Sequence, residues 1–234
     1  MSQHIVFSFD QDLQSVQAKV MRIGSLAETA LNDAVLSLET RDVKLAERVR
    51  TRDTLIDNLT EDIKVSCAKL LALRAPTAVD LRVVLSVMTI GGNLERIGDY
   101  AKNIAKRASV ISENPPVSVV HPLRTITDFV VHMISDSLDS YIQRSQSIAE
   151  SVLIRDQRVD EMYTALFRNM LIEMQEKQHE MTVGMHLQFI AKNIERAGDQ
   201  ATNIAEQTIY LATGMKPNDD RPKRDMTSYE TLRA

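Results

Sequence analysis

The sequence has little of what β-sheets, disulfides and tight turns are built from. It contains one cysteine, no tryptophan and only 4% aromatic residues, with seven glycines and six prolines. A single cysteine excludes an internal disulfide and fits a reducing compartment. Scarce aromatic and turn-forming residues, in a chain rich in alanine, leucine, isoleucine, valine and methionine, favour helices over strands.

Segments typical of membrane spans, signal peptides and nucleic-acid-binding surfaces are also missing. The net charge is −4 at pH 7, so the sequence lacks the basic surface that nucleic acids need. The opening MSQHIVFSFDQD has neither the basic start nor the apolar run of a signal peptide. No apolar run is long enough to cross a bilayer. We expect a cytoplasmic protein, for which contact with a membrane protein stays open.

What the sequence does contain is apolar residues at helical spacing along most of its length. Asp42 is placed to cap a helix, Pro76 interrupts the pattern, and the prolines of SENPPVS at 112–118 make the clearest break. Gly214 and Pro217 end the last periodic segment. The pattern predicts six long helices, at about 11–38, 42–73, 77–111, 120–143, 146–176 and 181–213.

The chain also contains an internal repeat. NLERIGDYAKNIA at 93–105 returns as NIERAGDQATNIA at 193–205, with nine of thirteen positions identical. RDVKLAERVRTRDTLID at 41–57 corresponds to RSQSIAESVLIRDQRVD at 144–160. These repeats predict an all-α fold of two tandem, similar three-helix bundles. The expected divisions are a first bundle over 1–112, a linker over 113–119, a second bundle over 120–214 and a mobile C-terminal tail over 215–234.

Acidic and amide side chains recur at four-residue spacing in both halves, which places them on one face of a helix. The stripes are Asp53 with Asp57, and Glu95 with Asp99 and Asn103, in the first half, and Asp156 with Asp160, and Glu195 with Asp199 and Asn203, in the second.

These stripes are predicted to meet in pairs. In an antiparallel hairpin, residues equidistant from the turn lie at the same height. Asp53 and Asp99 are equidistant from Pro76, and so are Asp57 and Glu95. The second half repeats this arrangement around a point between residues 177 and 178, for Asp156 with Asp199 and for Asp160 with Glu195. Converging carboxylates repel one another unless a cation lies among them, and oxygen ligands without His or Cys suit Mg, Ca, Mn or iron. The pattern predicts one multi-carboxylate metal site per half.

Other interpretations of the acidic stripes stay open. They fit a solvated face paired with the repeated arginines, because most charged helix faces are of that kind. They fit a structural module that docks basic partners, and they fit a carboxylate-bridged metalloenzyme of helical-bundle type. EKQH at 176–179 matches the Glu-x-x-His of di-iron bundles only once, whereas such sites need two copies. No phosphate loop, nucleophile elbow or Ser-His-Asp arrangement occurs.

The segments APTAVDLR at 75–82, NLERIGDYAKNIAK at 93–106 and NIERAGDQATNIAEQ at 193–207 resemble signatures of the PhoU family of phosphate-transport regulatory proteins. The resemblance covers nearly the whole chain and implies two three-helix bundles. It also implies multi-carboxylate metal sites, which in different members hold iron, zinc, magnesium or manganese. The family's Glu/Asp-x-x-x-Asp motifs correspond here to the eight acidic residues given above, and Asn103 and Asn203 match the asparagine that follows.

The resemblance implies a function as well. It implies a non-enzymatic, homodimeric adaptor that negatively regulates phosphate uptake and phosphate-starvation signalling. Its expected partners are the sensor histidine kinase of the phosphate regulon and the ATPase subunit of the phosphate ABC transporter. Two departures suggest that the halves are not equivalent: Gln200 stands where many second copies have histidine, and EMTVGMHL at 180–187 lacks the Asp-Leu-Arg of the first copy.

Overall fold

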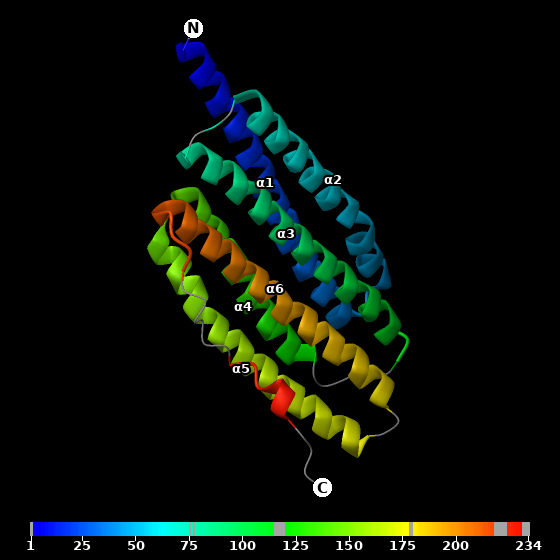
Figure 1. Cartoon of the computed structure of the whole chain (residues 1–234). Helices are drawn as coiled ribbons and strands as arrows, with labels where there is room; N and C mark the ends of the chain where they lie inside the picture. The colour runs from blue at the N-terminus through cyan, green and yellow to red at the C-terminus, as the bar shows by residue number, and fades with distance from the viewer. Residues whose placement is uncertain are drawn as a thin grey trace.

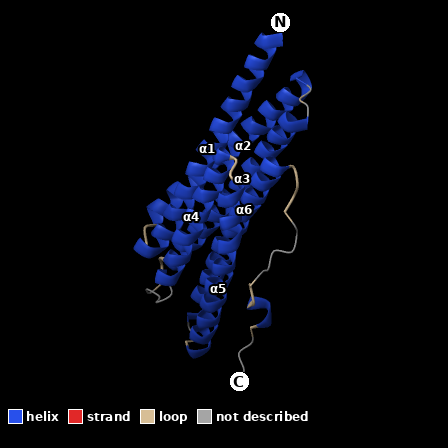
Figure 2. Cartoon of the chain, turned by 90° about the vertical axis from the view of Figure 1, so that its left-hand side faces the viewer, coloured by secondary structure: helices blue, strands red, loops and turns tan. Residues whose placement is uncertain are grey.

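The computed structural model of the chain is a bundle of six long helices (Figure 1). It describes residues 2–74, 76, 78–114, 120–177, 180–217 and 224–230, with the backbone alone for residues 2–10 and 74. The helices are α1 (Ser2–Thr40), α2 (Val43–Arg74), α3 (Ala78–Ile111), α4 (Val120–Gln143), α5 (Gln146–Glu176) and α6 (Met181–Thr213), followed by a short 3₁₀ helix, η2 (Thr227–Tyr229). The described residues include no strand, as Figure 2 shows, and none of these helices is apolar over enough of its length to cross a membrane.

The observed helix boundaries agree closely with the predicted ones, except at the start of the chain. The expectation of a first helix from about residue 11 is wrong, because α1 begins at Ser2. Its early turns extend beyond the ends of the neighbouring helices (Figures 1 and 2). The first ten residues contain neither glycine nor proline, so nothing in their sequence stops the helix from starting there.

The turns that open α2 and α5 have the same structure in both halves. Arg41 and Arg144 adopt left-handed backbone conformations, with φ of 57° and 50°. The residues that follow, Asp42 and Ser145, cap the helices: their side-chain oxygens accept hydrogen bonds from backbone N–H groups three residues later, at 3.0 and 3.4 Å. The predicted cap at Asp42 is confirmed, and the repeated sequence is also a repeated local structure.

The six helices form two three-helix bundles that share a long interface. The first bundle consists of α1, α2 and α3, the second of α4, α5 and α6, and contacts of α3 with α6 and of α1 with α4 join them. In Figure 1, α3 and α6 lie side by side through the centre, with α2 and α5 on opposite outer sides. One continuous hydrophobic core runs through both bundles. The all-α fold and its duplication are confirmed.

The last described segment, residues 224–230, contacts the second bundle, and the mobility that its charged composition predicted stays a prediction. The Met226 backbone N–H donates to Oγ1 of Thr164 at 3.2 Å, and Nε of Arg168 donates to the Glu230 carboxylate at 3.1 Å. The charged side chains of this segment pair with opposite charges on α5 and α6. The remainder of the predicted tail beyond 217, and most of the predicted linker, lie outside the described residues.

Candidate metal centres

Two helix pairs carry the predicted acidic sites: α2 with α3, and α5 with α6. A Cβ placed on Gly98 of α3 would lie 3.2 Å from Oδ1 of Asp53 on α2. A Cβ placed on Gly198 of α6 would lie 3.9 Å from Oδ1 of Asp156 on α5. Each glycine directly precedes the aspartate of its motif, so these approaches agree with the heights predicted from the hairpin turns. In both halves, the glycine leaves room for a carboxylate of the neighbouring helix.

Asp53 is the buried member of the first centre and is only 3% exposed. Its Oδ2 accepts a hydrogen bond from the Lys102 ammonium at 2.5 Å. Its Oδ1 is also buried, and no donor within the described residues bonds to it. A buried carboxylate is costly unless its charge is compensated. Lysine compensates one oxygen here and leaves the other, beside Gly98, without a partner.

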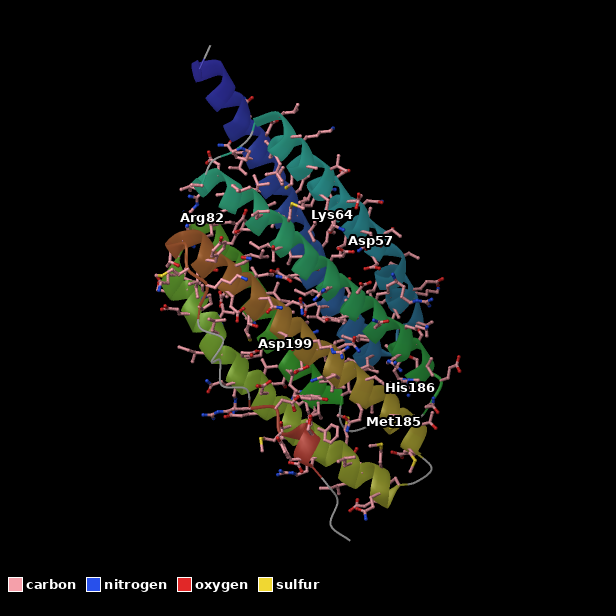
Figure 3. All side chains as sticks on the ribbon, in the orientation of Figure 1. Asp57, Lys64, Arg82, Met185, His186 and Asp199 are labelled. Atoms are coloured by element: carbon pink, nitrogen blue, oxygen red, sulfur yellow. The ribbon has the colours of Figure 1, made fainter. Side chains whose placement is uncertain are left out.

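Asp57 and Asp99 lie at the exposed edge of the same centre. Burial raises the pKa of the Asp99 carboxyl, the charge of Asp53 raises it further, Lys102 opposes the rise, and Asp57 adds to it. The three aspartates therefore share one electrostatic environment, as the sequence predicted. Figure 3 shows Asp57 beside α2 and Asp199 on α6, with α3 between them, so the two centres are separate.

The remaining residues of the first stripe lie on either side of Asp99. Glu95 is half-buried, and its Oε2 lies 3.9 Å from Nζ of Lys64 on α2. Asn103 is exposed one turn beyond Asp99. The Glu95 pair is long and partly solvated, so it contributes little to stability.

The second centre is more deeply buried than the first. Asp156, Asp160 and Glu195 are exposed by only 5%, 5% and 6%. Nζ of Lys192 lies 2.8 Å from Oε2 of Glu195. Burial raises the pKa of Glu195 to about 7, against the effect of Lys192 and with a further rise from the charge of Asp199.

The segment 224–230 covers this second centre. The backbone N–H of Arg224 donates to Oδ2 of Asp160 at 2.7 Å. Oδ2 of Asp225 lies 3.2 Å from the Lys192 ammonium that also contacts Glu195. Asp225 is thus a further carboxylate at the second centre, and the described residues place no such segment over the first.

Two members of the second stripe lie nearer the surface. Asp199 and Asn203 are both half-buried. Asn203 lines a groove between α3 and α6, together with Asn93. This position turns Asn203 toward the interface between the halves. Of the EKQH segment, Glu176 is exposed and His179 lies outside the described residues.

The donor chemistry of the first centre fits a hard cation, because its side chains offer carboxylate and amide oxygens. In addition, Oδ1 of Asp53, which lies beside Gly98, has no hydrogen-bond partner among the described residues. In the side-chain conformations of this structure, however, no three His, Cys, Asp or Glu side chains within the described residues are arranged to hold a metal ion. Lys102 and Lys192 supply positive charge instead. Ligation by the ten predicted residues stays a prediction, and at Asp53 it requires Lys102 to move away.

Sequence reasoning missed the lysines and Asp225. Lys192 precedes Glu195 by three residues, a spacing typical of ion pairs within a helix, so this pair carried a readable signal. Lys102 pairs across helices with Asp53, and Asp225 comes from a distant segment. Neither contact has a local sequence pattern.

Comparison with known proteins agrees with the resemblance. The sequence model of the PhoU domain matches the chain twice, over residues 20–108 and 123–208. A relative from Rhizobium meliloti, named phosphate-specific transport system accessory protein PhoU homolog, is 39% identical over 226 residues, which cover 96% of this chain and 95% of the relative. A relative of the same name from Xylella fastidiosa is 40% identical over 229 residues, covering 98% and 95%.

Solved structures show the same fold. The crystal structure of PhoU from Pseudomonas aeruginosa superimposes with a TM-score of 0.86 at 33% identity, covering 88% of this chain and all of that one (100%). The phosphate transport system regulatory protein PhoU from Streptococcus pneumoniae gives a TM-score of 0.84 at 30% identity, covering 90% and 99%. The repeated domain match, the near-complete coverage and the shared fold establish that the chain belongs to the PhoU family.

Proposed function

We propose that this chain is a regulatory adaptor of phosphate homeostasis that restrains phosphate uptake and phosphate-starvation signalling. The observation that carries the proposal is similarity over almost the whole chain to relatives named as accessory proteins of the phosphate-specific transport system. The structural neighbour from Streptococcus pneumoniae is named as a regulatory protein of that system. An accessory protein acts by contact, so the proposed role needs no catalysis.

The proposed partners are the sensor histidine kinase of the phosphate regulon and the ATPase subunit of the phosphate ABC transporter, reached from the cytoplasmic face of the membrane. The exposed edge of the first centre, with Asp57 and Asp99, supports a contact with a basic surface on one of them. We also propose that the chain works as a homodimer, which light scattering on the purified protein tests directly.

We further propose that the first centre binds a divalent or trivalent cation, such as magnesium, manganese, iron or zinc. Asp53, Asp57 and Asp99 would hold it, with Glu95 and Asn103 at its edge. The support is the oxygen-only donor set, the electrostatic coupling of the three aspartates and the partnerless buried Oδ1 of Asp53. A bound cation would replace Lys102 as the compensating charge and fix the shape of the exposed edge.

The regulatory role is tested in a strain that lacks this gene and carries a phosphate-starvation reporter. The full chain is expected to silence the reporter in phosphate-rich medium, and a tagged copy is expected to retain the kinase and the transporter ATPase in a pull-down. A reporter that stays silent without the gene, or a copy that retains neither partner, contradicts the adaptor role.

The metal site is tested separately. Purified protein is incubated with Mn²⁺, Mg²⁺, Fe²⁺ or Zn²⁺ in turn, then desalted and analysed for bound metal. A D53N/D57N/D99N variant is expected to lose the metal that the wild type retains. A control variant, E39Q/E47Q/E150Q, removes three exposed negative charges elsewhere and is expected to retain it. Equal metal in both variants would rule out the first centre while leaving the adaptor role intact.

A further inference from the structure

The contact between α3 and α6 joins the two copies of the repeat, but its two ends are filled differently. Positions one hundred residues apart on α3 and α6 are related by the sequence repeat. At one end, the guanidinium carbon of Arg107 lies 4.0 Å above the Phe189 ring, and its Nη1 lies 3.2 Å from Nδ1 of His186. Figure 3 shows His186 there, near the start of α6. A large aromatic ring and an arginine thus fill this end of the seam.

At the related end, smaller side chains take these three positions. Thr89 takes the position of Phe189, Gln207 that of Arg107, and Ser86 that of His186. The smaller residues leave an open groove of about 250 Å³. Its lining residues are Thr89, Asn93, Asn203, Glu206, Gln207 and Tyr210, with Lys216 and Pro217 at its border. Small-molecule sites often lie in grooves between domains, and this volume is just below their usual range of roughly 300–1,000 Å³.

The groove contains buried polar atoms that no described residue satisfies. Asn93 is only 9% exposed, and its Nδ2 has no hydrogen-bond partner. The repeat-related Asn193 differs, because its Nδ2 donates to the Phe189 carbonyl oxygen at 2.6 Å. Oε1 of Gln207 is likewise buried without a partner. Unsatisfied buried donors and acceptors are costly and rare. Both residues line the groove but hold these two atoms out of solvent contact, so a ligand with the complementary donor and acceptor would satisfy them once the two amides rotate toward it.

We propose that this groove binds a nucleoside monophosphate with an aminopurine base. Amide side chains recognise the adenine edge through one donor and one acceptor, which Asn93 and Gln207 supply. The Tyr210 ring offers a stacking surface for a base, Glu206 an acceptor for ribose hydroxyls, and the Lys216 ammonium a charge for the phosphate. The amides and the aromatic ring favour a nucleoside over phosphate alone. This inference is independent of the proposed adaptor role and metal site.

Calorimetric titration of the full chain with AMP is the primary test. One saturable site per chain is expected, with weaker binding of adenosine, ribose 5-phosphate and inorganic phosphate. Thr89→Phe introduces the residue that the other half has at this position, so that the larger ring fills the groove. This variant is expected to weaken AMP binding at least about tenfold. Thr125→Phe is the matched control: both threonines are exposed and donate to the carbonyl oxygen four residues earlier, at 3.0 and 3.2 Å.

A second pair of variants keeps the test decisive if Thr89→Phe fails to fold. Asn93→Asp keeps the shape but removes the unmet donor, and it is expected to weaken AMP binding at least about tenfold. Asn193→Asp makes the same change in the other half and is expected to leave AMP binding unchanged. The proposal is overturned if AMP does not bind saturably at millimolar concentration. It is also overturned if the folded groove variants bind AMP like wild type, or if ribose 5-phosphate or phosphate binds as tightly.

Discussion

At the scale of single residues, the glycine of each repeated motif decides how a carboxylate is held. Gly98 leaves the space into which Asp53 fits, and Lys102 compensates its buried charge. Gly198 faces Asp156 with more room, because a Cβ placed on it would lie 3.6 Å or more from its nearest neighbours. The glycine of the repeated motif thus has little free space beside it in the first half and more in the second.

This difference predicts unequal outcomes for two alanine substitutions. Gly198→Ala is expected to raise the free energy of unfolding by about 0.5–1 kcal/mol, because alanine favours the helix and the new methyl fits. Gly98→Ala is expected to gain less or to destabilise, because its methyl would lie 2.9 Å from Cδ1 of Ile56 and 3.2 Å from Asp53. Urea unfolding of both variants measures this, and equal stabilisation would show that Asp53 and Ile56 move aside freely.

Cys67 gives a second test at the residue scale. The thiol is buried in the first bundle, and burial raises its pKa to about 11, with Lys19 opposing the rise. Only the thiolate reacts with disulfide reagents, so the native thiol is expected to be inert at pH 7 and to react fully in urea. Absorbance with a coloured aromatic disulfide follows the reaction. A fast reaction in the native state would mean that α2 opens readily around Cys67.

At the scale of elements, the helices and the hairpin register were predictable because both follow from local information. Periodic apolar residues fix the helices, and equal rise per residue on both sides of Pro76 fixes which acidic residues are level. The partners of those residues were not predictable. Lys102 of α3 contacts Asp53 on the neighbouring helix α2. Asp225 contacts Lys192 from a segment whose composition is typical of disorder. Such contacts depend on the assembled surface, which single-sequence patterns do not contain.

The docking of residues 224–230 on α5 and α6 is testable through proteolysis. Asp225→Asn with Glu230→Gln removes the charge partners of Lys192 and Arg168. Weak surface pairs contribute modestly, so tryptic release of the C-terminal segment is expected to be roughly threefold faster than in wild type. Mass spectrometry of timed digests measures the rate.

The control for this digestion is Glu39→Gln with Glu47→Gln, which removes two exposed acidic charges far from the segment. It is expected to release the segment at the wild-type rate. If the Asp225 and Glu230 variant is cleaved no faster than this control, the ion pairs do not hold the segment in place.

At the scale of the whole molecule, a sequence duplication has produced two halves with different surfaces. One acidic centre is open at its edge, while the other is buried and covered by residues 224–230. One end of the α3–α6 seam is filled by Phe189 and Arg107, while the other is a groove. A duplicated scaffold therefore presents several distinct surfaces, which supports the proposed adaptor role.

The interface between the halves gives a pH-dependent prediction through Glu28 of α1. Burial raises the pKa of its carboxyl above 4.5, Asp139 raises it further, and His132 opposes the rise. Between pH 4.5 and the higher native pKa, the folded chain binds more protons than the unfolded chain, so the free energy of unfolding falls as pH rises through this window.

Glu28→Gln tests this, because glutamine cannot titrate. It is expected to match wild type in urea unfolding below about pH 4.5 and to unfold at a higher urea concentration at pH 8. The control is Glu39→Gln, an exposed carboxylate on the same helix, which is expected to follow wild type at both pH values. If the urea midpoints of Glu28→Gln and wild type change equally between pH 4.5 and pH 8, Glu28 is well solvated in the folded chain. The contact between α1 and α4 would then be looser than the structure shows.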